Sequence, residues 1–262
     1  MRCLVLLISV LCSASKTVAF MRNNLKLNYC VPVLKWKKIA FNVAIMTGAF
    51  ISSGNYNYAY ASSEESQVVR SLVTDGVDLF RKGEFGRSIH SFDLAIKKKP
   101  DLEPYLWQRG LALYFDKRFR ECSAQFKVDV TVNPRDTEEA IWDYICRSEE
   151  PSHSTLHLMK LSEPDKRRVM QLTYEVFQGN VDWYELEKLS SKSSETTYFY
   201  SKLYLSLYFH TINEDDKSLA FIREALNSNY ALLELDNRDL MISVAKHFEK
   251  SLLDRQKEQY IT

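Results

Sequence analysis

The sequence contains little glycine or proline: 7 Gly and 6 Pro occur among its 262 residues. Average usage would give roughly 18 and 13, so the composition excludes collagen-like and low-complexity chains and disfavours a loop-rich β fold. Five cysteines are too few for a disulfide scaffold. A net charge of +1 argues against bulk electrostatic binding of nucleic acid. With 45% hydrophobic residues, the chain can build the core of one or two soluble globular domains.

Acidic residues are absent from the first 63 positions, because the first one is Glu64. The same stretch carries seven lysines and arginines, and the remainder of the chain has a net charge of −6. A basic, apolar and acid-free N-terminus is typical of a targeting segment. We therefore expect the mature protein to comprise Ser62–Thr262.

Residues 1–19 match the pattern of a secretory signal peptide, in which Arg2 is followed by an apolar run and Ala19 is a small residue at the cleavage point. The following stretch, 20–38, opens with Phe20 and is basic and free of acids, which is the composition of a transit peptide. A signal peptide followed by such a stretch resembles the bipartite leader of proteins that are sent to secondary plastids.

A second signal-like pattern completes the segment 20–61. Two lysines at 37–38 precede the apolar residues 39–51, and an A-x-A cleavage site ends at Ala61. Behind a transit peptide this pattern resembles a thylakoid-lumen signal, and the paired lysines favour a Sec-type over a Tat-type route. The alternatives are that residues 39–51 stay as a short membrane anchor, or that the leader directs ordinary secretion or mitochondrial import.

After this segment the sequence repeats itself with a period of 34 residues. The pairs with this spacing are Gly76 and Gly110, Phe92 and Phe126, and Pro100 and Pro134. The period, with Gly, Phe and Pro in this order, resembles the tetratricopeptide repeat, a helical hairpin that stacks into a solenoid. The resemblance implies two repeats over 62–136, with the structural residues Gly76, Phe92, Ala95, Pro100, Gly110, Phe126 and Pro134.

The residue types of this repeat have simple physical reasons. Glycine lets the two helices of a hairpin approach closely, phenylalanine fills the space between consecutive hairpins, and proline ends the second helix. Gly83 suits the position just after the first helix. Ser62-x-x-Glu65 is a capping-box pattern and predicts where that helix begins.

The repeat pattern weakens over 137–262, where we expect a divergent helical, repeat-like region and a C-terminal cap. Apolar residues at helical spacing predict helices at Thr137–Ser148, Arg167–Gln178 and Val181–Leu189, a helix pair within Tyr198–Ser228, and a closing helix at Arg238–Lys250. Residues 149–165 are polar and predict a loop with a short helix. The expected fold class is all-α: a short tetratricopeptide-type helical-hairpin solenoid with a divergent helical C-terminal half.

The resemblance is closer than that of a generic repeat. The segments Tyr105–Gly110 and Val132–Trp142 and the tyrosine-rich Tyr198–Tyr204 resemble a plastid tetratricopeptide-repeat family of plants and algae, over about residues 66–250. That family has no settled biochemical activity, so the resemblance implies a fold and a compartment rather than a mechanism.

Peptide-binding members of the repeat family use the inner face of the first helix of each repeat, and one subclass holds a C-terminal carboxylate there with a charged clamp. The matching positions of this chain are apolar, so the clamp is missing. We predict an aromatic protein-binding groove instead, formed by Val73, Val77, Trp107, Leu111, Tyr114 and Phe115. The alternative is that the chain's own C-terminal helices cover this face.

Asp129 stands where the repeat has a small apolar residue. A buried carboxylate is costly unless it is paired, so we predict an ion pair with Arg109. Cys122 occupies a packing position and is interpreted as an inert buried thiol. Cys146 lies 24 residues further on, which leaves a redox pair as the alternative.

Signals for other chemistry are weak. His153-x-x-x-His157 has the spacing of a metal-binding pair, but no third ligand follows at a usual spacing. The sequence contains no phosphate-binding loop, dinucleotide-binding, nucleophile-elbow or zinc-cluster motif. We therefore expect no catalytic residue, no metal and no cofactor.

We expect a non-catalytic protein–protein interaction adaptor of the plastid, in the thylakoid lumen, that aids assembly or maintenance of a photosynthetic membrane complex. Its partner would be a protein or peptide that makes apolar and aromatic contacts, with peripheral association to thylakoid membrane complexes and no nucleic acid. The alternative is an enzyme or ligand-binding protein with a site between the repeats and the middle region. The polar lining of that site would be Arg109, Asp129, Glu138, Glu139 and His153.

Overall fold

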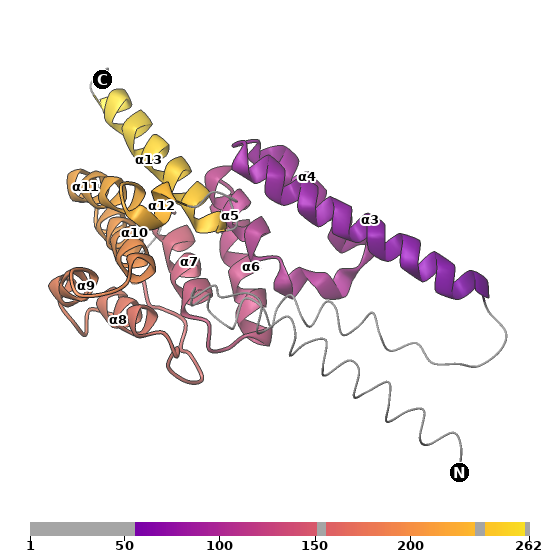
Figure 1. Ribbon diagram of the computed structural model, residues 1–262, viewed down its shortest axis with the longest axis horizontal. Helices are drawn as coiled ribbons and strands as arrows, with labels where there is room; N and C mark the ends of the chain where they lie inside the picture. Colours follow the sequence, from indigo (N-terminus) through magenta and orange to yellow (C-terminus); the bar gives the residue numbers. More distant parts are fainter. Residues whose placement is uncertain (1–55, 151–155, 234–238, 260–262) are drawn as a thin grey trace, which may run out of the picture. The chain divides into compact units, whose positions relative to one another are not determined.

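The computed structural model describes residues 56–150, 156–233 and 239–259 (Figure 1). The chain divides into two compact units, 1–54 and 55–262, and the described residues belong to the second. They form eleven α-helices and one 3-10 helix, with no strand among them. The predicted all-α class is confirmed for this unit. The predicted signal peptide and the apolar residues 39–51 lie outside the described residues.

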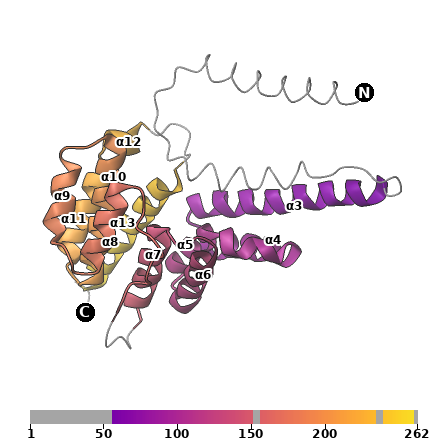
Figure 2. The same ribbon diagram turned by 90° about the horizontal axis from the view of Figure 1, so that it is seen from below.

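Most of the helices follow one another along the chain with short connections, and the longest connection, residues 149–167, joins α7 to α8 (Figures 1 and 2). Their bounds are α3 Tyr56–Arg81, α4 Phe85–Lys98, η1 Pro100–Tyr105, α5 Trp107–Phe115, α6 Phe119–Val132, α7 Thr137–Ser148, α8 Arg168–Phe177, α9 Trp183–Ser190, α10 Glu195–Thr211, α11 Asp215–Leu226, α12 Asn229–Leu232 and α13 Leu240–Gln259. The bounds of α7 are those predicted from the sequence.

Several predicted boundaries differ from the observed ones. Helix α3 begins at Tyr56, so the predicted capping box at Ser62 lies inside the helix and does not open it. Helix α13 continues to Gln259, well beyond the predicted end at Lys250, and the short helix α12 was not predicted. The described part of the 149–165 segment contains no helix.

Neighbouring helices pack in pairs: α3 with α4, α5 with α6, α8 with α9, and α10 with α11. In two of these pairs, a glycine of the first helix lies in close contact with a phenylalanine ring of the second helix. A Cβ atom added to Gly76 would lie 2.8 Å from the ring of Phe92, and one added to Gly110 would lie 2.7 Å from the ring of Phe126. The missing side chain therefore sets the distance between the paired helices.

A hydrogen bond from a serine hydroxyl to a backbone carbonyl recurs at the same place in two pairs. The Ser88 hydroxyl donates to the carbonyl oxygen of Gly76 at 2.7 Å. The Ser218 hydroxyl donates to the carbonyl oxygen of Ser206 at 2.8 Å. In both pairs the donor and the acceptor are 12 residues apart, and both serines are buried. The first and the fourth pairs thus hold their two helices together through the same local contact.

The turn within each pair also recurs. One residue between the two helices adopts the left-handed conformation: Gly83, Lys117, Gly179 and Asn213, with φ between 60° and 76°. The next amide donates back to a carbonyl five residues earlier, as from Glu84 to Leu79 at 2.9 Å. This is the Schellman pattern that ends a helix and satisfies its last carbonyl groups.

Prolines follow the second helix of the first two pairs. Helix α4 ends at Lys98 and Pro100 opens η1, while α6 ends at Val132 and is followed by Pro134. Ala95 of α4 is fully buried. The largest core cluster joins residues of α3 to α8 and of α10, α11 and α13.

Replacing Gly110 by alanine is expected to lower the free energy of unfolding by about 1–3 kcal/mol, because the new Cβ would overlap the buried Phe126 ring. Gly86 of α4 provides the control. It is exposed, and a Cβ atom added there would lie 3.8 Å from an Asp116 carboxylate oxygen, an ordinary van der Waals distance. Gly86→Ala should stabilise the helix by about 0.5–1 kcal/mol. Denaturant unfolding measures both; equal effects of the two substitutions would contradict the close-contact account.

Candidate interaction site

The six predicted groove residues lie on two helices: Val73 and Val77 on α3, and the other four on α5. Leu111 and Tyr114 are buried, so they present no surface to a partner in this conformation. Val73, Val77 and Trp107 are half-buried. Phe115 is half-buried too, but helix α13 packs against it. The partly accessible groove residues away from α13 are therefore Val73, Val77 and Trp107, which we call the Val73–Trp107 end.

Helix α13 covers the other end, where Phe115 lies. The His247 ring packs against the rings of Phe80, Phe85 and Phe115, with centroids 5.4, 5.0 and 5.7 Å apart. Its Nε2 donates to the carbonyl oxygen of Phe80 at 2.9 Å, because a carbonyl group can only accept. Burial lowers the pKa of His247, which favours the neutral ring in these aromatic surroundings. At Phe115 the face is thus partly covered by the chain itself.

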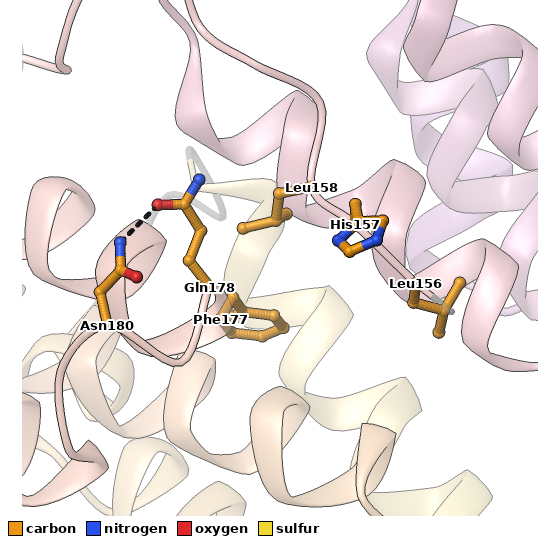
Figure 3. Close-up of a pocket in the computed structure, with 6 residues that line it drawn as sticks. All are labelled: Leu156, His157, Leu158, Phe177, Gln178 and Asn180. Carbon is orange, nitrogen blue, oxygen red and sulfur yellow. Dashed lines mark hydrogen bonds between the residues drawn. The ribbon is translucent and has the colours of Figure 1, made fainter. Parts of the chain in front are cut away.

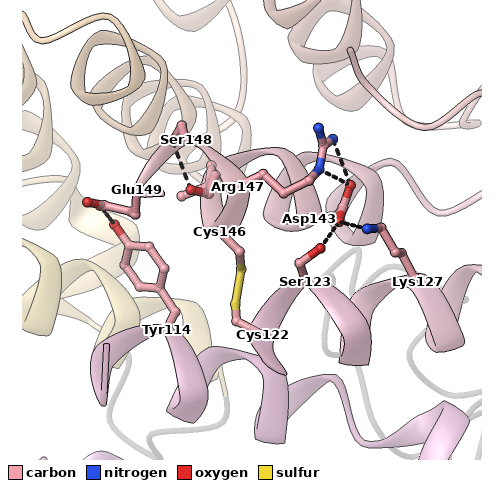
Figure 4. The surroundings of a disulfide bond; sticks show 10 residues. Tyr114, Cys122, Ser123, Lys127, Asp143, Cys146, Arg147, Ser148 and Glu149 are labelled. Carbon is pink, nitrogen blue, oxygen red and sulfur yellow. Dashed lines mark hydrogen bonds and ion pairs between the residues drawn. A yellow bond between two sulfur atoms is a disulfide. The ribbon is translucent and has the colours of Figure 1, made fainter. Parts of the chain in front are cut away.

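A cluster of charged groups lies at the end of α7. The Glu149 carboxylate accepts hydrogen bonds from the Tyr114 hydroxyl at 2.8 Å, from His210 Nε2 at 2.8 Å and from Arg255 at 2.7 Å (Figure 4 shows the first). Its side chain is 11% exposed. The cluster joins α5, α10 and α13 at one carboxylate.

His210 lies between two carboxylates. Its Nε2 faces Glu149, and its Nδ1 is 3.0 Å from a carboxylate oxygen of Asp215. Burial lowers the pKa of His210, but the hydrogen bonds with Asp215 and Glu149 outweigh it and raise the pKa above the usual 6.5. Burial raises the pKa of Glu149, yet the hydrogen bond and charge of His210 and the charge of Arg255 lower it to about 2. Burial and the Glu149 carboxylate raise the pKa of Tyr114 well above 10. The protonated imidazole can donate to both carboxylates at once, which a neutral ring cannot.

Sequence reasoning missed this cluster. It placed Glu149 in a loop, and His210 and Arg255 lie 61 and 106 residues further along the chain. No spacing rule relates such distant positions. The groups of the cluster are hydrogen-bonded to one another, so their arrangement fits a structural tie between helices rather than an acid–base pair that faces a substrate.

Arg109 and Asp129, the predicted ion pair, belong to one polar network. Arg109 donates to Asp93 at 2.7 Å and to the side-chain oxygen of Gln125 at 3.0 Å. The amide nitrogen of Gln125 then donates to Asp129 at 3.0 Å. Gln125 therefore connects the two residues, a bridging role that the sequence did not predict.

Glu138, Glu139 and His153 are the other residues predicted to line a site if the protein is an enzyme or a ligand-binding protein. Glu138 accepts hydrogen bonds from Arg167 at 2.7 Å and from Tyr204 at 3.0 Å. Glu139 is buried on α7, and His153 lies outside the described residues. Glu138 thus belongs to a second network, formed with Arg167 and Tyr204.

A pocket among the described residues has a volume of about 260 Å³ (Figure 3). Its lining residues are Leu156, His157, Leu158, Phe177, Gln178 and Asn180. Asn180 donates to Gln178 at 2.9 Å, as Figure 3 shows. None of the predicted site residues lines this pocket, and it brings no carboxylate beside its histidine.

Cys122 of α6 and Cys146 of α7 form a disulfide (Figure 4). The interpretation of Cys122 as an inert thiol is therefore wrong, and the pairing that was the alternative is the observed one. Next to the disulfide, Asp143 of α7 accepts hydrogen bonds from Ser123 of α6 at 2.6 Å and from Arg147 at 2.9 Å. A covalent bond and a buried hydrogen bond thus connect the same two helices.

Three further findings bear on function. The described residues include no group of three or more His, Cys, Asp or Glu side chains that could hold a metal ion. None of the described helices combines the length and apolar character needed to cross a membrane. No model of a known protein family matches the chain.

Proposed function

We propose that the chain is a tetratricopeptide-type helical-hairpin protein that acts as a non-catalytic adaptor between proteins. The observation that supports this most is the recurrence of one hairpin geometry. The 34-residue period places Gly76 and Gly110 against Phe92 and Phe126, and the same left-handed turn follows in each pair. Stacked hairpins of this kind present a continuous inner face to a partner.

The half-buried end of this face is the proposed contact surface. Trp107 lies there with Val73 and Val77, and aromatic anchors of this kind dominate the energetics of protein interfaces. The other end is filled by an α-helix of the chain itself, which contributes His247 to the aromatic rings. The proposed partner segment is accordingly an apolar helix or peptide.

The proposed place of action is the plastid, in the thylakoid lumen, where the adaptor aids assembly or maintenance of a photosynthetic membrane complex. The supporting feature is the basic, acid-free leader with two successive signal-like patterns before Glu64. The mature chain after the leader is acidic overall, with a net charge of −6.

Replacing Trp107 by alanine is expected to reduce partner capture by about ten-fold or more, the loss typical of a tryptophan hot spot. The test is covalent crosslinking of the purified protein in an extract of its source cells, followed by mass spectrometry. Tyr184 of α9, which is 57% exposed, supplies the control. Tyr184→Ala should leave capture unchanged.

Circular dichroism first establishes that both variants keep the helical content of the parent protein. Equal capture by folded Trp107→Ala and by the parent would overturn the proposed contact surface. Mass spectrometry of the protein recovered from its own cells also gives its N-terminus. A start at or within a few residues of Ser62 supports the luminal assignment, whereas a start near Phe20 argues for retention of residues 39–51 as an anchor.

A further inference from the structure

Cys122 occupies a position that holds a buried serine in two other helix pairs. It lies 12 residues after Gly110, and the equivalent positions of two other pairs are Ser88 and Ser218, which bond the two helices of their own pair. In the α5–α6 pair the sulfur of this residue is bonded to the next helix, α7. The cysteine therefore links one hairpin to the element that follows it.

Both cysteines are fully buried, and they belong to the same core cluster as Tyr114, Phe126 and Trp142. Their Cα atoms are 6.0 Å apart, within the range that a disulfide spans without movement of the backbone. A thiolate that attacks a disulfide must reach one of its sulfur atoms. Neither sulfur is reachable while α7 is packed against α6.

We propose that Cys122–Cys146 is a permanent structural disulfide, which is closed during folding and then shielded from thiol reductants by the packing of α7. This inference does not rest on the proposed function. It assigns the folding of this chain to an oxidising compartment, because cytosolic thiol pools keep protein cysteines reduced. The disulfide would fix the position of α7 and, with it, the Glu149 cluster at the end of that helix.

Formation of the Cys122–Cys146 bond requires an oxidant. We assign this role to a disulfide, RS–SR, of a small molecule or of another protein. The thiolate of one cysteine attacks a sulfur of RS–SR and releases RS⁻, which leaves a mixed disulfide. The second cysteine, as a thiolate, then attacks the protein sulfur of that mixed disulfide and releases the second RS⁻. The two cysteines lose two electrons and two protons in total, and RS–SR is reduced to two thiols.

The first test is a tryptic digest of the full chain from its own cells, with free thiols alkylated under denaturing conditions and no reductant. Cleavage places Cys122 in peptide 121–127 and Cys146 in peptide 136–147. We expect one linked species of these two peptides, which disappears on reduction. Alkylation of both peptides, or linkage of either one to Cys3, Cys12 or Cys30, would overturn the proposal.

The second test measures shielding. Dithiothreitol should reduce the folded protein at least about a hundred-fold more slowly than the protein in denaturant, because the sulfur atoms must first become accessible. Equal rates would show that the bond is open to exchange and would overturn the permanent role.

The third test uses Cys122→Ser, which introduces the serine found at the equivalent place in the first and the fourth pairs. Its Tm should fall by roughly 10 °C, the effect of opening a loop of this length. Prereduced parent protein should show the same fall, and reductant should not change the Tm of the variant. An unchanged Tm in the variant would mean that the bond does not stabilise the fold.

Discussion

Replacing Glu149 by alanine is expected to lower the free energy of unfolding by about 3–5 kcal/mol, the cost of removing one partner from a buried charge cluster. The carboxylate accepts three hydrogen bonds, from Tyr114, His210 and Arg255. Without it, the Tyr114 hydroxyl and His210 Nε2 lose an acceptor in the interior. Chemical denaturation of the parent and the variant measures the difference.

The neighbouring residue provides a matched control. Glu150 also accepts a hydrogen bond from an arginine, Arg120, at 3.0 Å. The Arg120 side chain is 85% exposed, so solvent screens this pair and Glu150→Ala should cost less than about 1 kcal/mol. Similar losses for the two alanine variants would show that Glu149 is no more important than a surface carboxylate.

The same cluster makes stability depend on pH. The folded protein raises the pKa of His210, so protonation of this ring stabilises the fold below the unfolded pKa near 6.5. That contribution is lost as the pH rises through the higher folded pKa. Glu149 has a lowered pKa of about 2, so its contribution is present above the unfolded value of 4.5 and is lost as the pH falls toward 2.

The groups that face His210 are Glu149, Asp215, Arg255 and, through Glu149, Tyr114. The pKa of Asp215 is lowered, chiefly by its hydrogen bond with His210. In Glu149→Ala the loss of stability at alkaline pH should therefore shrink but not vanish, because Asp215 remains. Denaturant unfolding across the pH range separates this electrostatic effect from a simple packing defect, which would leave the pH profile unchanged in shape.

Local structure was largely predictable from the sequence. The helix Thr137–Ser148 was predicted to the residue from its apolar positions at helical spacing. The structure adds the cap at its start, where the Asp136 side chain accepts from the Glu138 amide. Gly83 adopts the positive φ expected just after a helix. The 34-residue spacing of glycines and phenylalanines corresponds to two equivalent close contacts. These features are encoded within a few residues or within one repeat.

Long-range features were not predictable in the same way. The extension of α13 beyond Lys250 contains many polar residues, and it is kept in place by buried Leu252 and by the bond from Arg255 to Glu149. The short helix α12 depends on Ser228, whose hydroxyl accepts from the Ala231 amide. Whether the inner face is open or covered depends on where α13 lies, and the residues of α13 are remote in sequence from the face that they cover.

The covering of the Phe115 end by α13 raises the question of whether a partner displaces this helix. Its Val244, Ala245, Phe248 and Leu252 side chains are almost completely buried, and α13 also packs against α11. Phe248 contacts the His210 ring at a centroid distance of 5.2 Å. A helix with this much buried apolar surface behaves as part of the core rather than as a removable lid.

Phe248→Ala is accordingly expected to lower the free energy of unfolding by about 3–5 kcal/mol, the usual cost of a large cavity in a core. Lys246→Ala, on an exposed position of the same helix, should change it by less than about 0.5 kcal/mol. A displaceable helix would behave differently: Phe248→Ala would leave global unfolding nearly unchanged and would increase partner capture. The expected large loss of stability, with no gain in capture, would restrict partner binding to the Val73–Trp107 end of the inner face, because α13 would remain bound at the other end.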